Sequence, residues 1–156
     1  MIRKSLFALA VIALVGLNLA LRRDLDTAQA YRDGVARALD LAAQPGSQTA
    51  LLAGQDATVS GLGVIGTDGT VELVMRGLAP TSGAQVYTAW TIGQNGAAPI
   101  SLGDFTVGSD GRAVASTKTP GTSPGDTIAL TLENGSGHTA PGGPVVAAGQ
   151  TKGGSG

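Results

Sequence analysis

The hydrophobic pattern divides the chain into an unbroken apolar run, an amphipathic stretch and a region of short alternating segments. The run, Ser5 to Leu21, holds no charged residue over about seventeen positions, the lower end of what crosses a bilayer as a helix. Arg3 and Lys4 precede it, and Arg22 and Arg23 follow it. The pattern therefore predicts a single transmembrane helix at residues 5–21.

A cleaved signal peptide is the main alternative for this run. Both possible cleavage sites are poor. Asn18-Leu19-Ala20 begins with asparagine where a small residue is needed, and Ala28-Gln29-Ala30 lies beyond several charged residues. We therefore predict a signal anchor. Basic residues are nearly balanced across the run and barely set its orientation. We expect residues 1–4 to be cytoplasmic, because the rest of the chain resembles an exported domain.

The amphipathic stretch at residues 22–46 predicts a helical stalk. Pro45-Gly46 is expected to end this helix. The apolar face either covers part of the following domain or pairs with a second copy in a short coiled coil. The face has spacings of four and three, with one arginine in it: Leu21, Leu25, Ala28, Arg32, Val35, Leu39 and Ala42.

Residues 47–150 carry short segments with the period of β-strands, separated by turn residues. Two Asp-Gly pairs, Asp68-Gly69 and Asp110-Gly111, each predict a hairpin. Together these features favour an Ig-like antiparallel β-sandwich, followed by a flexible tail at residues 151–156. The segments expected as strands are 59–65, 71–76, 85–92, 100–107, 112–118, 126–133 and 145–148.

The last long segment shows the clearest alternation. Its apolar residues Ile128, Leu130 and Leu132 are expected to face the core, and its polar residues Thr131 and Glu133 to face solvent.

Composition narrows the function classes. Charged residues make up 13% of the chain, aromatic residues 3%, and the net charge is −1. A chain of this charge offers no basic face for nucleic acid. It contains no cysteine, so neither a disulfide framework nor a thiolate metal site is expected.

The residues also argue against catalysis. Gly121-Thr122-Ser123-Pro124-Gly125 has the spacing of a nucleophile elbow, but Pro124 lacks the backbone N–H that this motif needs, and a strand is expected next. His138 is the only histidine, so no histidine pair can bind a metal. Asp104, Asp110 and Asp126 resemble turn residues more than paired acid–base groups. We expect no enzyme activity, no metal and no cofactor.

Two segments of the β-region together carry a family signature. The first contains Tyr87 and Trp90 in Val86-Tyr87-Thr88-Ala89-Trp90-Thr91-Ile92, followed by Pro99 and Gly103. The second contains Glu133 in Leu130-Thr131-Leu132-Glu133, followed by further motif residues at Gly135, Ser136, Pro141 and Pro144. In this order the two segments resemble the extracytoplasmic C-terminal domain of anti-sigma-K factors. Asn134 replaces the proline that usually follows the glutamate in that family.

This resemblance implies a single-pass bacterial regulator in which a cytoplasmic domain holds a sigma factor until proteolysis releases it. Only four residues precede the apolar run, so we expect no sigma-binding domain and no direct sigma-factor binding by this chain. The expected function is regulatory sensing at the plasma membrane through a membrane or envelope protein partner. A structural or adhesive envelope module is the alternative.

Overall fold

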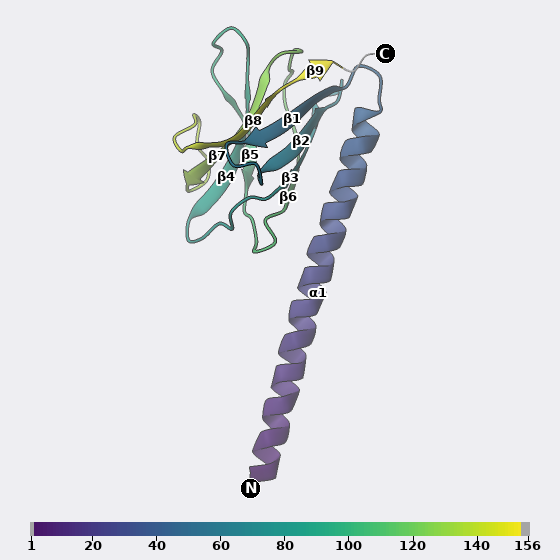
Figure 1. Ribbon diagram of the computed structural model, residues 1–156, viewed down its shortest axis with the longest axis vertical. Coiled ribbons are helices and arrows are strands. Elements are labelled where there is room, and N and C mark those ends of the chain that lie inside the picture. Colours follow the sequence, from purple (N-terminus) through teal and green to yellow (C-terminus); the bar gives the residue numbers. More distant parts are fainter. Residues whose placement is uncertain (1, 154–156) are drawn as a thin grey trace.

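A long helix followed by nine strands makes up residues 2–153, the part of the chain that the computed structural model describes (Figure 1). Side chains are described from residue 16 onward. Helix α1 runs without a break from Ile2 to Ala42. After it, Gly46 adopts a left-handed conformation (φ 81°), and the Ser47 hydroxyl donates a hydrogen bond to the Leu41 carbonyl (2.6 Å). The predicted span and stalk are thus parts of one helix.

The N-terminal end of α1 is where the membrane-spanning segment was predicted. Within the described residues, no helix is long and apolar enough to cross a membrane. The side chains of residues 5–15, most of the predicted span, lie outside what the structure describes. The structure therefore gives no support to a transmembrane helix at Ser5–Leu21.

The strands form one antiparallel sheet in the order β5-β4-β7-β8-β1-β2-β3-β6, with β9 paired to β1. The two ends of this order, β5 and β6, also lie close together, so the sheet is nearly closed. The strands are β1 (Gln48–Gly54), β2 (Ser60–Ile65), β3 (Thr70–Arg76), β4 (Gln85–Ile92), β5 (Ile100–Phe105), β6 (Ala113–Lys118), β7 (Thr127–Asn134), β8 (Val145–Gln150) and β9 (Lys152–Gly153).

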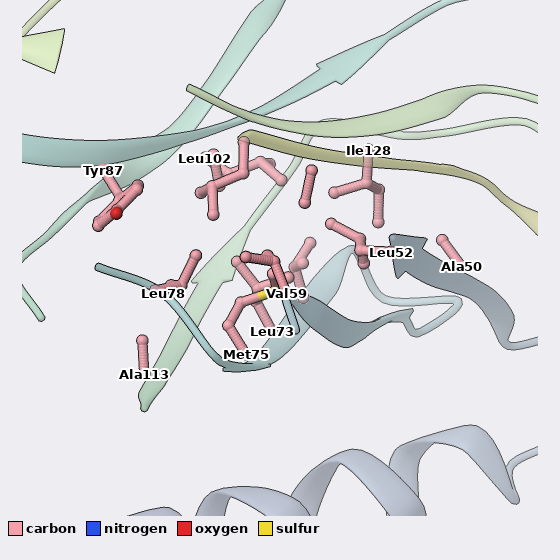
Figure 2. Close-up of a cluster of buried hydrophobic side chains, with 14 of the residues drawn as sticks. Ala50, Leu52, Val59, Leu73, Met75, Leu78, Tyr87, Leu102, Ala113 and Ile128 are labelled. Carbon is pink, nitrogen blue, oxygen red and sulfur yellow. The ribbon is translucent and has the colours of Figure 1, made fainter. Parts of the chain in front are cut away.

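The core lies between the two halves of this sheet, β1-β2-β3-β6 and β5-β4-β7-β8 (Figure 2). Leu73 and Met75 enter it from one half, and Tyr87, Leu102 and Ile128 from the other. The mainly β prediction is confirmed. Two separate sheets of an Ig-like sandwich are not formed, because backbone pairing continues from β8 into β1 and joins the halves.

All seven predicted strands are present, but one of the two predicted hairpins is wrong. Asp68-Gly69 joins β2 to β3 as expected, with Gly69 at φ 79°. Asp110-Gly111 does not join β5 to β6 as a hairpin, because these strands pair with β4 and β3 respectively. The Val107 amide donates to Thr81 Oγ1 (3.1 Å), which fixes the chain where it leaves β5 and crosses to the other half.

Two segments of the sheet were not predicted. Strand β1 has seven residues and lies centrally, between β8 and β2. The prediction of a flexible tail at residues 151–156 is wrong for its first residues, because Thr151 is buried and its amide donates to the Asp126 carbonyl (2.7 Å). Residues 152–153 then pair with β1, and residues 154–156 lie outside the described part of the chain.

Candidate functional site

The C-terminal part of α1 packs on the outer face of β2 and β3. Ala38 and Leu41 of the helix are buried against Val64 and Val74 of these strands. Gly34 faces β6 so closely that an added Cβ would overlap the side chain of Val114. The absence of a side chain at residue 34 therefore allows the helix to lie against the sheet. A sequence pattern based on apolar residues does not reveal this contact, because glycine is not counted in it.

Polar contacts support the same interface. Glu72 of β3 is 4% exposed, and its Oε1 accepts hydrogen bonds from Arg37 Nε (3.4 Å) and from the Ser116 hydroxyl (2.7 Å). The guanidinium of Arg112 lies 5.1 Å from the ring centroid of Tyr31, within the range of a cation–π interaction. Because a buried carboxylate needs partners, Glu72 ties the helix to both β3 and β6.

The buried face of α1 differs from the predicted one. Leu25 and Leu39 of the predicted face are 60% and 58% exposed, whereas Ala38 and Leu41 are buried. Val35 does lie against the sheet. Ala42 of the predicted face also packs there, so the prediction is right for Val35 and Ala42 and wrong for the two leucines. The stalk therefore covers part of the domain, which is one of the two predicted alternatives. The face of the helix that does so is rotated relative to the predicted face.

A second cluster of buried polar groups lies on the outer face of the other half. Trp90 of β4 is completely buried, yet it lies outside the apolar core between the halves. Its indole Nε1 donates to Thr131 Oγ1 (2.8 Å), and the Thr131 hydroxyl donates to Glu133 Oε1 (2.6 Å). Thr131 and Glu133 were expected to face solvent, but they are 0% and 3% exposed.

The glycine loop, residues 135–144, explains this burial. The Gly137 amide donates to Asp104 Oδ2 of β5 (2.8 Å), and the Gly142 amide donates to Glu133 Oε1 of β7 (3.0 Å). Because β4 lies between β5 and β7, the loop crosses the outer face of β4 near Val86 and Thr88, which pair with Glu133 and Asp104. A Cβ on Gly143 would overlap the Leu132 carbonyl oxygen, so the loop approaches too closely for a side chain there.

The environment of Glu133 keeps its carboxyl ionised. Burial raises its pKa, but hydrogen bonds from Thr131, Gly142 and Gly143 and the charge of nearby His138 outweigh that effect. The net result is a pKa below the ordinary value of 4.5. Glu133 is thus an ionised anchor for the glycine loop, beside an open pocket of about 440 Å³.

The other motif residues have local roles around this cluster. The Tyr87 hydroxyl donates to the Ala79 carbonyl (3.0 Å), and its ring stacks on Phe105. Gly103 has φ 114°, a conformation that favours glycine, at a bulge where β5 holds one residue more than the paired part of β4. The Gly135 amide donates to the Ala84 carbonyl (2.9 Å). Pro144 accepts a hydrogen bond from the Leu132 amide (3.2 Å), and Pro141 is exposed in the glycine loop.

The sequence around Ser123 forms a turn. The Ser123 amide donates to Asp126 Oδ2 (2.7 Å), and its carbonyl accepts from the Thr151 hydroxyl (2.9 Å). Strand β7 follows at Thr127, where a nucleophile elbow would need a helix. Within the described residues, no three acidic or histidine side chains gather in a group that could hold a metal ion.

A family model described as "Anti-sigma-K factor rskA, C-terminal" matches residues 5–145. This range includes α1 almost entirely, the docked helix interface and the Trp90–Glu133 cluster. No curated protein matches the chain.

Proposed function

Because the chain belongs to the anti-sigma-K factor C-terminal family, we propose that it is a membrane-held regulatory domain that controls sigma-factor-dependent transcription. The proposed place of the β-domain is outside the plasma membrane. Helix α1 is the element through which a change in the β-domain would reach the membrane. In this proposal the chain acts on the sigma factor through a membrane or envelope protein partner.

The apolar run supports membrane anchoring. Residues 5–21 carry no charge and are flanked by basic residues on both sides, a pattern typical of a signal anchor. The family match begins at residue 5, so it includes this run.

The docked helix is the observation that supports regulation most. Gly34, Ala38 and Leu41 hold the last turns of α1 against the sheet, and Arg37 pairs with the buried Glu72 (3.4 Å). Because α1 is continuous from residue 2 to residue 42, a change in this contact also changes the position of the helix's N-terminal end. A binding event on the β-domain thus has a direct physical route to the membrane.

A transcription measurement tests the regulatory role. RNA levels are compared between cells of the source organism that lack the chain, cells that express it and cells that express Gly34→Leu, which separates α1 from β6. We expect promoters of one sigma factor to change together when the chain is present. The variant should lose this effect at equal protein level. Gly16→Ala is the matched control, because an added Cβ there meets no atom within 4 Å. No coordinated change of a sigma-dependent set would overturn the proposal.

A separate pair of measurements tests location. The protein should stay in the membrane fraction after an alkaline carbonate wash, and alkaline phosphatase fused after residue 156 should be active. A Val11→Asp change interrupts the apolar run and should release the protein from the membrane, because an aspartate at the centre of a span costs about 3 kcal/mol. A soluble chain that begins at Tyr31 would instead reveal a cleaved signal peptide.

A further inference from the structure

Strand β6 lies at one end of the sheet order and has a paired strand on one side only. Within residues 2–153, β6 pairs with β3 alone, and β5, the strand at the other end, pairs with β4 alone. The two end strands approach each other without pairing. An end strand of this kind presents a row of backbone N–H and C=O groups that no neighbouring strand engages.

The register shows which backbone groups of β6 point away from β3. The Thr119 amide donates to the Gly69 carbonyl (2.9 Å), and the antiparallel pairing continues in step from there along the whole of β6. In such a pair, the backbone groups of successive residues point alternately toward the partner strand and away from it. The free edge of β6 therefore consists of the N–H and C=O groups of Val114, Ser116 and Lys118.

The edge of β5 has features that discourage the addition of a strand, whereas the free edge of β6 is regular. Gly103 of β5 lies at a bulge with φ 114°, and its amide donates back to Ser101 Oγ (3.2 Å). A bulge interrupts the ladder that an incoming strand would continue. Strand β6 pairs with β3 without a shift, and its one charged side chain, Lys118, is drawn toward Asp68 of the β2–β3 turn (3.3 Å).

Apolar side chains beside the free edge are incompletely covered. Ile100 of β5 is 41% exposed, and Phe105 of β5 and Ala115 of β6 are only partly buried where they pack on the core. Alternate residues of an added strand would point to the core side and would cover such side chains. The occupant that fits both features is an extended backbone with apolar side chains at alternate positions.

A second copy of this chain fits the free edge less well than a segment of another protein. Two identical strand edges pair antiparallel around a two-fold axis. That rotation would reverse the direction of α1, because the helix lies on the face of the sheet, with Gly34 against Val114. The N-terminal ends of the two helices would then point in opposite directions and could not enter one membrane. This choice of partner rests on the proposed function.

We propose that the free edge of β6 binds an extended segment of the membrane or envelope partner, which adds to the sheet as a further strand. Main-chain hydrogen bonds supply the affinity in this mode of recognition, and pockets for alternate side chains supply the specificity. The segment has apolar residues at alternate positions and no proline where its N–H faces β6, because each proline would remove a ladder bond.

Strand addition at this edge would act on the docked helix. Val114 lies against Gly34 of α1, and the Ser116 hydroxyl donates to Glu72 (2.7 Å), which also accepts from Arg37 of α1 (3.4 Å). The residues that form the free edge are thus also residues that hold the helix. A bound segment would fix their position and so stabilise the docked state of α1.

Hydrogen exchange of the purified full chain in detergent micelles tests the geometry of the edge, with single amides followed by NMR. The amides of Val114 and Ser116 should exchange quickly, whereas those of Ala115 and Thr117, which face β3, should exchange slowly. Slow exchange at Val114 and Ser116 at every protein concentration would overturn the proposal. Slow exchange that appears only as the concentration rises, together with a dimer in sedimentation, would assign the edge to a second copy and would also overturn it.

The binding probe is an acetylated peptide of alternating threonine and valine with a lysine at each end. It should slow exchange at Val114 and Ser116 saturably, with a Kd of about 1 mM or lower. N-methylation of the threonines and N-methylation of the valines block opposite edges of the peptide, because successive amides point to opposite sides. One methylated peptide should bind and the other should not. Absence of protection by the unmodified peptide, or equal binding of both methylated peptides, would overturn the proposal.

Two changes at Ser116 separate the edge from a structural effect. Ser116→Pro and Ser116→Ala both lose the hydroxyl that bonds to Glu72, but only the proline variant also loses the outward amide. Proline is tolerated where the N–H of an edge strand faces solvent, so the two variants should have similar melting temperatures. Ser116→Pro should weaken peptide binding about tenfold, and Ser116→Ala should bind like the natural chain.

Equal peptide affinity of the two Ser116 variants would contradict the proposal. The methylated peptides test the same edge on the natural chain, so the result does not depend on how well Ser116→Pro folds. These readouts involve no transcription, so their failure leaves the test of the regulatory role intact.

Discussion

The two outer faces of the sheet are covered by different kinds of segment, and each cover closes over a glutamate. Under α1, Glu72 is 4% exposed and meets Arg37 and Ser116. Under the glycine loop, Glu133 is 3% exposed and meets Thr131 and the backbone amide of Gly142. The first cover is a helix held by side chains, and the second is a loop held by its own backbone.

This difference separates a switchable contact from a fixed one. The Arg37 side chain is 52% exposed, so its ion pair with Glu72 is screened by water and contributes little to stability. The glycine loop joins β7 to β8, so it cannot lift away without disturbing the sheet itself. We therefore expect changes under the loop to unfold the β-domain, and changes under α1 to release only the helix.

The largest effect is expected at the buried tryptophan that bonds to Thr131 on the loop-covered half of the sheet. Trp90→Ala should lower the free energy of unfolding by about 3–5 kcal/mol, because it removes a fully buried side chain. Trp90→Phe should fall between this variant and the natural protein, since it keeps most of the ring but loses the bond to Thr131. Chemical denaturation measures both. An unchanged denaturation midpoint for Trp90→Ala would make the tryptophan an exposed residue instead.

Two glycines give the sharpest contrast between the covers. Gly143→Ala forces a Cβ onto the Leu132 carbonyl and should destabilise the β-domain by about 1–3 kcal/mol. Gly34→Leu should speed hydrogen exchange in residues 31–42 while the melting temperature of the β-domain stays nearly constant. Equal loss of β-domain stability in both variants would remove the distinction between the covers.

How far the sequence could predict this architecture depends on how local each signal is. Asp68-Gly69 and the alternation of Ile128 and Leu130 are local, and both were predicted correctly. The burial of Thr131 and Glu133 depends on a loop that follows later in the chain. Alternation alone therefore predicted that both side chains face solvent. Asp110-Gly111 has the form of a hairpin turn, but β5 and β6 find other partners.

The α1 interface illustrates a second limit. Glycine and alanine give the helix its close approach, and neither carries a strong hydrophobic signal. Trp90 and Glu133 were identified through a family resemblance, but the hydrogen bonds by which Thr131 links them were not predicted. Linkage of this kind requires knowledge of strand register, which pairs Thr88 with Thr131 across β4 and β7.

Acid should weaken the loop-covered face through Glu133. The pKa of Glu133 is lower in the folded protein than its ordinary value of 4.5, so its stabilising contribution is present above that pH. It is lost as the pH falls through the lower folded pKa. Glu133→Gln should therefore reduce the loss of stability below about pH 4.5, as measured by melting temperature against pH. An identical pH profile for both proteins would show that Glu133 is not the group involved.

The smallest effect is expected at Arg37. Arg37→Gln should lower stability by less than about 1 kcal/mol, because the arginine is half exposed and glutamine can still donate to Glu72. Hydrogen exchange in α1 is the sensitive readout, with Asp40→Asn as an exposed control on the same helix. A loss of several kcal/mol would mean that the helix contact is part of the fold rather than a switchable cover.

The central claim is that α1 and the β-domain are docked as one body, so that a change in the domain moves the helix. The chain has no cysteine, so the paired changes Asp33→Cys and Ser136→Cys place spin labels on the helix and on the glycine loop without competition. Pulsed electron–electron double resonance then measures the distance between them. The account predicts one narrow distance distribution, which Gly34→Leu broadens. A broad distribution in the otherwise natural chain, unchanged by Gly34→Leu, would contradict it.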